Sequence, residues 1–485
     1  MQYVSTRGQV APIEFQDAVM MGLADDGGLL VPQSIPDARD QLERWRALPY
    51  PDLAMEVLRL YATDIPPADL EALIRKTYSE AAFGRQVAPT VPVGDIFVLE
   101  LWHGPTQAFK DVALQLLGNL FEYILARRGG STPLATSRLN ILGATSGDTG
   151  SAAIAGCRGR AGIHIFVMHP RGRVSPIQER QMTTVLEENV HNIAIEGSFD
   201  DCQRLMKDLA GDLDFKRRYC LGAVNSVNWA RVLAQIVYYF KTAFDVQAVT
   251  GARAVRVAVP TGNFGDVLAG WYAMKMGAPI AQLILATNVN DILARFFQTG
   301  EYSIASVRQT LSPSMDIQVA SNFERYLYHK VGCDAGRLRA LMSDFAKTGS
   351  LKVNVPPGGT VDADFVAGRA SEEEVLATIR TYHEKYDYLL DPHTAVGVCV
   401  AEKVSGANTA ANSAAVAPRH AVTPEPIVCL ATAHPAKFPD AIRQATGEDW
   451  ARHPAIDALM HLPTRCQALP NDQRAVREFI VSKIG

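Results

Sequence analysis

Short apolar runs alternate with longer segments of helical period through most of the chain. The runs predict strands at 96–101, 139–142, 163–168, 192–195, 255–259 and 283–287, and the longer segments predict helices at 109–127, 149–159, 175–185, 199–213, 264–276 and 290–298. Strand and helix alternating at these lengths indicate right-handed crossovers and mostly parallel sheets with flanking helices. The predicted fold class is therefore α/β.

The two ends of the chain depart from this pattern. Residues 1–95 combine an Asp-Asp-Gly-Gly turn and several prolines with short helical segments, which predicts a separate N-terminal domain. Residues 405–426 lie between a predicted helix at 393–404 and a predicted strand at 427–430, and they are rich in Ala, Ser, Asn and Pro without periodicity. We expect a mobile surface loop there.

Composition narrows the class of protein. The 485 residues carry 47 Lys+Arg and 51 Asp+Glu, a net charge of −4, and 48 % hydrophobic residues exclude a mostly disordered chain. No basic stripe suggests a nucleic-acid partner, and no run approaches 18 apolar residues, so no membrane partner is expected. The seven cysteines are scattered without metal-ligand spacing, which predicts reduced thiols, no metal site and a cytoplasmic protein.

The first segment with candidate chemistry is residues 100–114, ELWHGPTQAFKDVAL. It places Lys110 in the first turn of a helix that follows a strand and a Gly-Pro turn. The positive end of a helix lowers the pKa of a lysine, and a neutral amine can attack a carbonyl and hold a Schiff base. A surface lysine beside Asp111, an ordinary first-turn carboxylate, fits the spacing as well, so this segment alone does not decide.

The second segment, residues 141–153 (ILGATSGDTGSAA), runs from a strand through a loop of glycines and hydroxyls into a helix of small residues. Such a loop exposes backbone amides at a helix N-terminus and favours a carboxylate or phosphate. The alternative is a tight turn that Ser146 or Asp148 caps, with glycines serving only close packing.

The third segment, residues 255–270, contains a Gly-x-x-Gly turn at 262–265 between a strand and a helix. A phosphate fits this turn, although Asp266 would repel it unless the side chain caps the helix or faces away. The turn lacks the Gly-x-Gly-x-x-Gly fingerprint of dinucleotide-binding folds, which disfavours a nicotinamide enzyme.

The fourth segment, residues 426–438, is a buried strand that ends at Thr432. Its hydroxyl lies where open α/β sheets bind ligands, although a helix cap is an alternative role. Because all four segments are turns after strands, a parallel sheet would bring them to one edge. A lysine, two anion receptors and a hydroxyl together match pyridoxal phosphate (PLP), with its aldehyde, phosphate and ring nitrogen.

With these segments in view, the chain closely resembles the threonine synthases, PLP enzymes of the β-family fold (fold type II), over nearly its whole length. The resemblance rests on eight ordered segments: 3–8 (YVSTRG), 26–32 (DGGLLVP), 103–111 (HGPTQAFKD), 144–150 (ATSGDTG), 225–231 (NSVNWAR), 262–266 (GNFGD), 391–397 (DPHTAVG) and 432–438 (TAHPAKF). The long N-terminal region and the Thr-Ser-Gly-Asp-Thr-Gly loop are similar to the longer fungal and enterobacterial type.

The resemblance implies a role for each matching position. Lys110 would hold the cofactor as a Schiff base and transfer protons, Thr432 would bond the pyridine nitrogen, and the cofactor phosphate would bind Gly262, Asn263, Phe264, Gly265 and Asp266. The substrate carboxylate would bind Thr145, Ser146, Asp148 and Thr149, and candidates for the substrate phosphate are His103, Thr106, Asn228 and Arg231. Because Asp148 replaces an asparagine of many relatives near the cofactor's phenolic oxygen, we expect it to be protonated, turned away or balanced by a cation.

The implied reaction converts O-phospho-L-homoserine and water to L-threonine and phosphate, the last step of threonine biosynthesis. The implied domains are 1–95, a large PLP-binding domain of 96–142 and 230–485, and a small mobile domain of 143–229. Two alternatives stay open: a phospholyase or dehydratase that releases 2-ketobutyrate, and a catalytically silent metabolite-binding relative. The presence of Lys110 disfavours the silent relative.

Overall fold

The structure, a computed structural model, describes residues 1–128, 138–222, 226–355, 360–413 and 425–484. Its largest sheet has six strands in the order β13-β10-β9-β14-β4-β3. The strands are β3 (Thr90–Val93), β4 (Ile96–Glu100), β9 (Val255–Pro260), β10 (Ile280–Thr287), β13 (Phe365–Arg369) and β14 (Ile427–Ala431). Except for the antiparallel edge strand β3, neighbouring strands are parallel.

The centre of this sheet positions three of the four candidate segments. Every residue of β9 and β14 is buried, as expected for parallel strands covered on both faces. Val428 of β14 is paired with Phe97 of β4 and with Val257 of β9, so the three strands run side by side in one direction. Lys110, the Gly262 turn and Thr432 therefore follow adjacent strands at the same edge.

A second, five-stranded parallel sheet has the order β15-β7-β6-β5-β8. Its strands are β5 (Leu139–Ala144), β6 (Ile163–Pro170), β7 (Val190–Glu196), β8 (Leu221–Gly222) and β15 (Gln467–Pro470). The expectation of a single sheet edge was wrong, because the second candidate segment follows β5 of this sheet. The sheet also joins residues that the predicted boundaries assign to different domains, since β5 begins at Leu139 and β15 comes from near the C-terminus.

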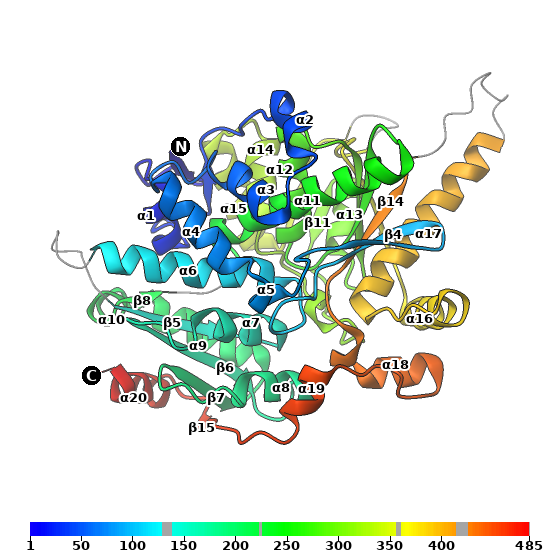
Figure 1. Cartoon of the computed structure of the whole chain (residues 1–485). Helices are drawn as coiled ribbons and strands as arrows, with labels where there is room; N and C mark the ends of the chain where they lie inside the picture. Colours follow the sequence, from blue (N-terminus) through cyan, green and yellow to red (C-terminus); the bar gives the residue numbers. More distant parts are fainter. Residues whose placement is uncertain (129–137, 223–225, 356–359, 414–424, 485) are drawn as a thin grey trace.

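Helices cover both sheets, and the five-stranded sheet lies below the six-stranded one in Figure 1. Helices α11 (Trp229–Thr250), α12 (Gly265–Met276), α13 (Ile292–Thr299) and α17 (Pro392–Ser413) pack on strands of the larger sheet. The other helices of this part of the molecule are α6 (Lys110–Arg128), η2 (Pro313–Met315), α14 (Phe323–Lys330), α15 (Ala335–Thr348), α16 (Glu372–Tyr386), η3 (Pro435–Lys437) and α18 (Pro439–Thr446). The second sheet carries α7 (Asp148–Cys157), α8 (Pro176–Thr183), α9 (Phe199–Gly211), α10 (Leu213–Arg218), α19 (Pro454–Leu459) and α20 (Gln473–Ile484). A short antiparallel pair joins β11 (Glu301–Ser303) and β12 (Ser350–Lys352).

The alternation in the sequence is thus confirmed, with one difference near the C-terminus. Helix α17 continues to Ser413, so the first part of the loop expected at 405–426 is helical. The Ser405 hydroxyl donates to the Ala401 carbonyl within this helix, at 2.9 Å. Residues 414–424 of the expected loop lie outside the described residues.

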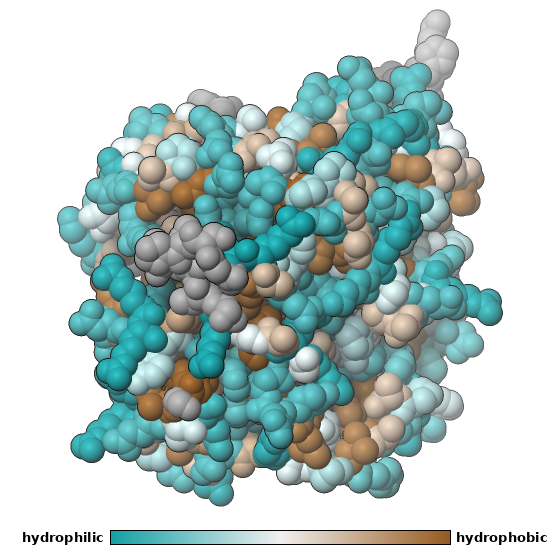
Figure 2. All heavy atoms as spheres, turned by 60° about the vertical axis from the view of Figure 1, so that its left-hand side comes forward, coloured by the Kyte–Doolittle hydropathy of each residue, from teal (hydrophilic) through white to brown (hydrophobic). Residues whose placement is uncertain are grey.

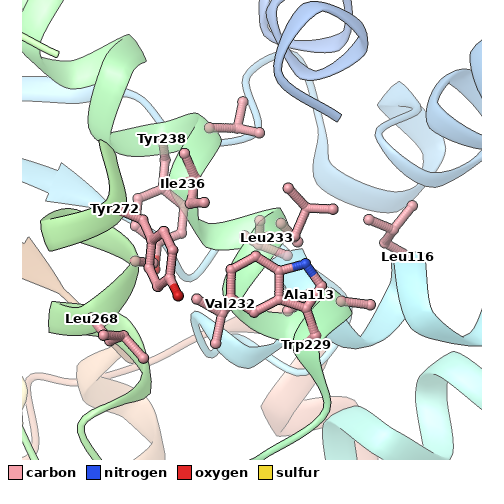
Figure 3. Packing of buried hydrophobic residues seen from close by; sticks show 14 of the residues in the cluster. Ala113, Leu116, Trp229, Val232, Leu233, Ile236, Tyr238, Leu268 and Tyr272 are labelled. Carbon is pink, nitrogen blue, oxygen red and sulfur yellow. The ribbon is translucent and has the colours of Figure 1, made fainter. Parts of the chain in front are cut away.

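Helix α11 is the buried centre of the large core. Its first residue, Trp229, is fully buried and lies at 5.0 Å between ring centroids from Tyr272 of α12. Figure 3 shows the indole among Val232 and Leu233 of its own helix and Ala113 of α6. Burial of one large aromatic side chain contributes on the order of 2–3 kcal/mol, so this contact fixes α6, α11 and α12 together.

The N-terminal region packs on this core. It comprises β1 (Tyr3–Ser5), α1 (Phe15–Met21), β2 (Leu30–Pro32), η1 (Arg39–Gln41), α2 (Leu42–Trp45), α3 (Tyr50–Leu58), α4 (Pro67–Thr77) and α5 (Glu80–Phe83). The fully buried Arg325 donates to the carbonyls of Leu30 and Val227 and to Asn322 Oδ1. One guanidinium therefore ties β2 to the segments that precede α11 and α14.

The face in Figure 2 is mostly hydrophilic, and hydrophobic atoms form several small separate patches. None of the helices in the described parts of the chain has the length and apolar character that a membrane span requires. Each of the seven cysteines is a free thiol.

Candidate active site

A cavity of about 730 Å³, including its open mouth, lies where the two sheets meet. The predicted site residues that line it are Lys110, Asp148, Thr149, Arg231, Gly262, Asn263, Phe264, Gly265, Asp266 and Thr432. Phe109, Ser226, Gln235, Pro260, Thr261, Ser314, Met315, His393 and Ala433 complete the lining. The structure therefore brings all four candidate segments together, three from the larger sheet and one from the smaller.

Lys110 is the first residue of α6, and its side chain is 10 % exposed. Burial lowers the pKa of Lys110, and the positive charges of Lys437 and Arg231 lower it further, while Asp148 opposes them. A lowered pKa was expected from the helix N-terminus, but the largest cause in the structure is burial. The amine is therefore easier to deprotonate than that of an ordinary lysine.

Asp148 is the first residue of α7, and two cations balance its charge. Of the three expectations for this residue (protonated, turned away or balanced by a cation), the structure shows the third. Its Oδ1 accepts from Lys437 Nζ at 2.8 Å and from Gln178 Nε2 at 2.8 Å, and its Oδ2 lies 3.6 Å from Lys110 Nζ. Although burial raises the pKa of Asp148, the charges of Lys437 and Lys110 outweigh it and hold that pKa well below its ordinary range. Asp148 is therefore a buried carboxylate at neutral pH.

Lys437 was missed by the sequence analysis. Its side chain is completely buried, and its Nζ also donates to the Thr106 carbonyl at 2.6 Å. Buried lysines almost always have a charged partner, so a lysine within the apolar segment 432–438 next to a strand end was the available signal.

The Gly262 turn leads into α12 with a shape suited to close approach by a ligand. A Cβ at Gly262 would lie 2.5 Å from the Ser314 carbonyl oxygen. Phe264 takes a left-handed conformation with φ of 64°, which costs a non-glycine residue about 1 kcal/mol. Its ring packs among the rings of Phe297 and Phe323, which offsets this cost. The first amides of a helix lack partners within it, so those at the start of α12 are available to an anion.

Asp266, the second residue of α12, pairs with two tyrosines of α11 and makes no capping hydrogen bond. Its Oδ1 accepts from the hydroxyls of Tyr238, at 2.5 Å, and Tyr239, at 2.8 Å. Burial raises the pKa of Asp266 to about 6 against these two hydrogen bonds and the nearby charge of Lys110. Its Oδ2 is buried without a hydrogen-bond partner among the described residues.

A hydrogen-bond network that includes the 391–397 motif holds Thr432 in place. Its amide donates to Thr394 Oγ1 at 3.2 Å, and Thr394 in turn donates to Asp391. Asp391 also accepts from His393 Nδ1 at 2.9 Å, while His393 Nε2 accepts from the Ser314 amide at 3.2 Å. The hydrogen-bond pattern thus assigns the proton of His393 to Nδ1. It also links Thr432 to Ser314, whose carbonyl oxygen lies next to Gly262.

Only some of the residues predicted to bind the substrate carboxylate line the cavity. Thr149 lines the cavity, whereas Ser146 is exposed and outside the lining. Thr145 Oγ1 accepts from the amides of Gly147, at 3.0 Å, and Gly150, at 2.9 Å, so it shapes the loop from within. Their roles toward a substrate stay predictions.

Of the four candidates for the substrate phosphate, Arg231 lies in the cavity. Burial lowers its pKa to about 10, so it remains charged at neutral pH, and its Nε and Nη1 have no hydrogen-bond partner among the described residues. Asn228 instead caps α11 and donates to the Val19 carbonyl at 2.8 Å. Thr106 donates to Asp111 at 2.9 Å, and His103 pairs with Glu100 at 2.8 Å; neither lines the cavity.

The chemistry of these residues fits pyridoxal phosphate. A buried amine of lowered pKa suits its aldehyde, and the turn at Gly262 with the start of α12 suits its phosphate. In the same cavity, Nε and Nη1 of Arg231 are hydrogen-bond donors without a partner among the described residues. An uncompensated buried guanidinium is costly unless an anion binds it, so this residue points to an anionic ligand.

A lysine in a cleft between two α/β sheets, beside a glycine-rich anion receptor, defines the class of PLP-dependent enzymes. The profile described as "Pyridoxal-phosphate dependent enzyme" matches residues 85–355. The profiles "Threonine synthase N terminus" and "Threonine synthase, C-terminal" match residues 2–78 and 394–480.

Individual relatives agree with these profiles. The threonine synthase of Pseudomonas aeruginosa is 44 % identical over 99 % of this chain and 98 % of its own. The crystal structure of a PLP-bound threonine synthase from Brucella melitensis matches with a TM-score of 0.89 at 44 % identity, over 100 % of this chain and 99 % of that one. Yeast threonine synthase matches with a TM-score of 0.91 at 39 % identity, over 99 % and 98 %. The chain belongs to the threonine synthase family, and its cofactor is pyridoxal phosphate.

Proposed function

We propose that this chain converts O-phospho-L-homoserine and water to L-threonine and inorganic phosphate. The observation that carries the proposal is that one cavity holds a buried lysine and also Arg231, whose Nε and Nη1 have no hydrogen-bond partner among the described residues, in addition to the turn that suits the cofactor's phosphate. A substrate that carries its own phosphate, in addition to the phosphate of the cofactor, accounts for that arginine. Family membership over the full length of the chain supports the same reaction.

The cofactor supplies electron withdrawal, which makes the α and β protons of a bound amino acid acidic. Lys110, as a neutral amine, would accept the α proton, pass it on, and then accept a β proton. Phosphate would leave from the γ carbon, and water would add its hydroxyl to the β carbon. Of the two protons that Lys110 removes and the one that water supplies, one would go to the γ carbon, one would return to the α carbon and one would leave with the phosphate. Burial lowers the pKa of Lys110, which favours the neutral amine, the form that can accept a proton.

Arg231 would hold the substrate phosphate, and its planar guanidinium can donate two parallel hydrogen bonds to phosphate oxygens. The amides of Ser146, Asp148 and Thr149, with the Thr149 side chain, would hold the substrate carboxylate, because the amides of Gly147 and Gly150 already donate to Thr145 Oγ1. The Thr432 hydroxyl would bond the pyridine nitrogen without keeping it protonated, because a hydroxyl carries no charge. These placements would set the substrate's carbon chain beside the Lys110 amine.

Closure of the small domain is part of the proposal. Residues 143–229 would move toward the large domain when substrate binds, and we propose that 467–484 move with them because β15 pairs with β7. Limited proteolysis tests this: a substrate analogue should protect the loops between the sheets, and identical digestion patterns with and without the analogue would count against closure. The seven free thiols support a cytoplasmic location.

Product analysis tests the reaction itself. The purified, PLP-loaded protein is incubated with O-phospho-L-homoserine, and threonine, 2-ketobutyrate and phosphate are quantified together. The proposal requires one threonine for each phosphate. Phosphate with 2-ketobutyrate would assign a phospholyase to the same site, and no turnover would favour a silent relative.

A further inference from the structure

Asp148 separates two lysines that reach it from different strands of the larger sheet. Lys437 follows β14 and lies 2.8 Å from Oδ1, within a full hydrogen bond, whereas Lys110 follows β4 and lies 3.6 Å from Oδ2. The exposed fractions of the three side chains are 0 %, 10 % and 3 % for Lys437, Lys110 and Asp148. The carboxylate is thus paired mainly with the lysine that lies outside the cavity lining.

This unequal pairing has a chemical consequence for Lys110. A buried carboxylate with only one cation nearby draws that cation into contact and keeps it protonated. Lys437 supplies the compensating charge instead, and the Thr106 carbonyl at 2.6 Å holds its ammonium in place. We propose that Lys437 is a positioning residue, which by pairing with Asp148 leaves the Lys110 amine free to react.

The other charged groups near Lys110 either act in the same direction or make hydrogen bonds to other residues. Arg231 on α11 adds a positive charge, which disfavours the protonated amine. Asp266 on α12 accepts from two tyrosines. His393 on α17 donates to Asp391. Lys437 is therefore the group that decides whether Asp148 can hold a proton on Lys110.

The inference rests on the proposed role of Lys110, but its test does not use turnover. Cofactor-free full-length protein is treated across a pH series with acetic anhydride, a small reagent that acetylates neutral amines. Modification of Lys110 is followed by peptide mass spectrometry. In Lys437→Gln the pH midpoint of Lys110 modification should rise by about one unit or more. A midpoint that stays at the wild-type value would overturn the proposal, whether or not the enzyme makes threonine.

Two matched variants separate charge from structure. Lys437→Arg keeps the charge and should restore the wild-type midpoint. Gln178→Leu removes a neutral donor from the same oxygen, Asp148 Oδ1, and should shift the midpoint by much less than Lys437→Gln. Equal shifts in Lys437→Gln and Gln178→Leu would show that only packing around Asp148 matters and would contradict the inference.

A second pair of variants covers the case in which Lys437→Gln does not fold. Asp148→Asn removes the carboxylate, so the midpoint of Lys110 should fall. Adding Lys437→Gln to Asp148→Asn removes the opposing charge and avoids an unpaired buried carboxylate, so the midpoint should return toward the wild-type value. If the midpoint is the same in Asp148→Asn and in the double variant, Lys437 does not act on Lys110.

Discussion

Lys437 Nζ lies 2.8 Å from Asp148 Oδ1, so a buried ion pair joins the two sheets of the molecule beside its active site. Asp148 begins the helix after β5 of the smaller sheet, and Lys437 follows β14 of the larger one. Lys110 is 3.6 Å from the same carboxylate. Any movement of one sheet relative to the other therefore changes the charge environment of the reactive amine.

Lys110→Ala should abolish turnover. The variant lacks the amine that would accept the α and β protons, and loss of such a group lowers the rate by on the order of 10³-fold or more. Steady-state release of phosphate from O-phospho-L-homoserine measures this directly. Lys403→Gln is the matched control, since Lys403 is a half-exposed lysine that pairs with Glu374 and does not line the cavity. A Lys110→Ala protein with the wild-type rate would remove this lysine from the mechanism.

Gly262→Ala should weaken cofactor binding by about tenfold or more, because the new Cβ would lie 2.5 Å from the Ser314 carbonyl oxygen and displace the turn. Fluorescence titration with pyridoxal phosphate gives the dissociation constant. Gly211→Ala is the control, since a Cβ there meets nothing within 4 Å. Equal affinity in Gly262→Ala and wild type would show that this turn does not hold the cofactor phosphate.

Asp266 should make stability depend on pH. Its pKa is raised by burial from 3.8 to about 6. Between these values the folded chain binds more protons than the unfolded chain, so its contribution to the free energy of unfolding falls as pH rises. Relative to Asp266→Asn, the wild-type protein should lose about 2 kcal/mol between pH 4 and pH 7.

Urea unfolding of both cofactor-free proteins at several pH values measures this difference. Asp440→Asn, at a carboxylate that is 89 % exposed, is the control and should follow the wild type. If the difference in free energy of unfolding between Asp266→Asn and wild type is the same at every pH, Asp266 is ionised equally in the folded and unfolded chains, which would contradict the prediction.

Thr432→Val should lower kcat by about 10- to 100-fold, with a smaller effect on cofactor affinity, because it removes one hydrogen bond from the cofactor ring at nearly constant volume. Thr432→Ser keeps the hydroxyl and should retain most activity. Stopped-flow and steady-state rates of both variants distinguish loss of the hydrogen bond from a change in packing. Equal loss in Thr432→Ser and Thr432→Val would assign the effect to packing against the Thr394 network.

Much of this architecture could be predicted from the sequence. The strands of the sheets are continuous apolar runs, and the turns after them contain glycines and hydroxyls, so Lys110, Gly262 and Thr432 could be placed at strand ends before their contacts were known. The division into two sheets could not be predicted, because periodicity along the chain does not say which strands pair. Strand β15, from near the C-terminus, beside β7 is the clearest example.

The contacts made by polar side chains were harder to foresee than their positions. Asn228 and Thr106 belong to motifs shared with the family, yet their side chains bond the Val19 carbonyl and Asp111, at 2.8 and 2.9 Å. The role of Lys437 depends on a partner 289 positions away in the chain, which no local pattern indicates. Residues that shape a site and residues that face a ligand thus look alike in sequence.

The identity of the lysine that holds the cofactor tests the central claim most directly. The PLP-loaded protein is reduced with borohydride, which fixes the cofactor to whichever lysine carries it, and the modified peptide is identified by mass spectrometry. The account predicts a single pyridoxyl group on Lys110. A pyridoxyl group on Lys437, its neighbour across Asp148, would contradict both the mechanism and the role assigned to the ion pair.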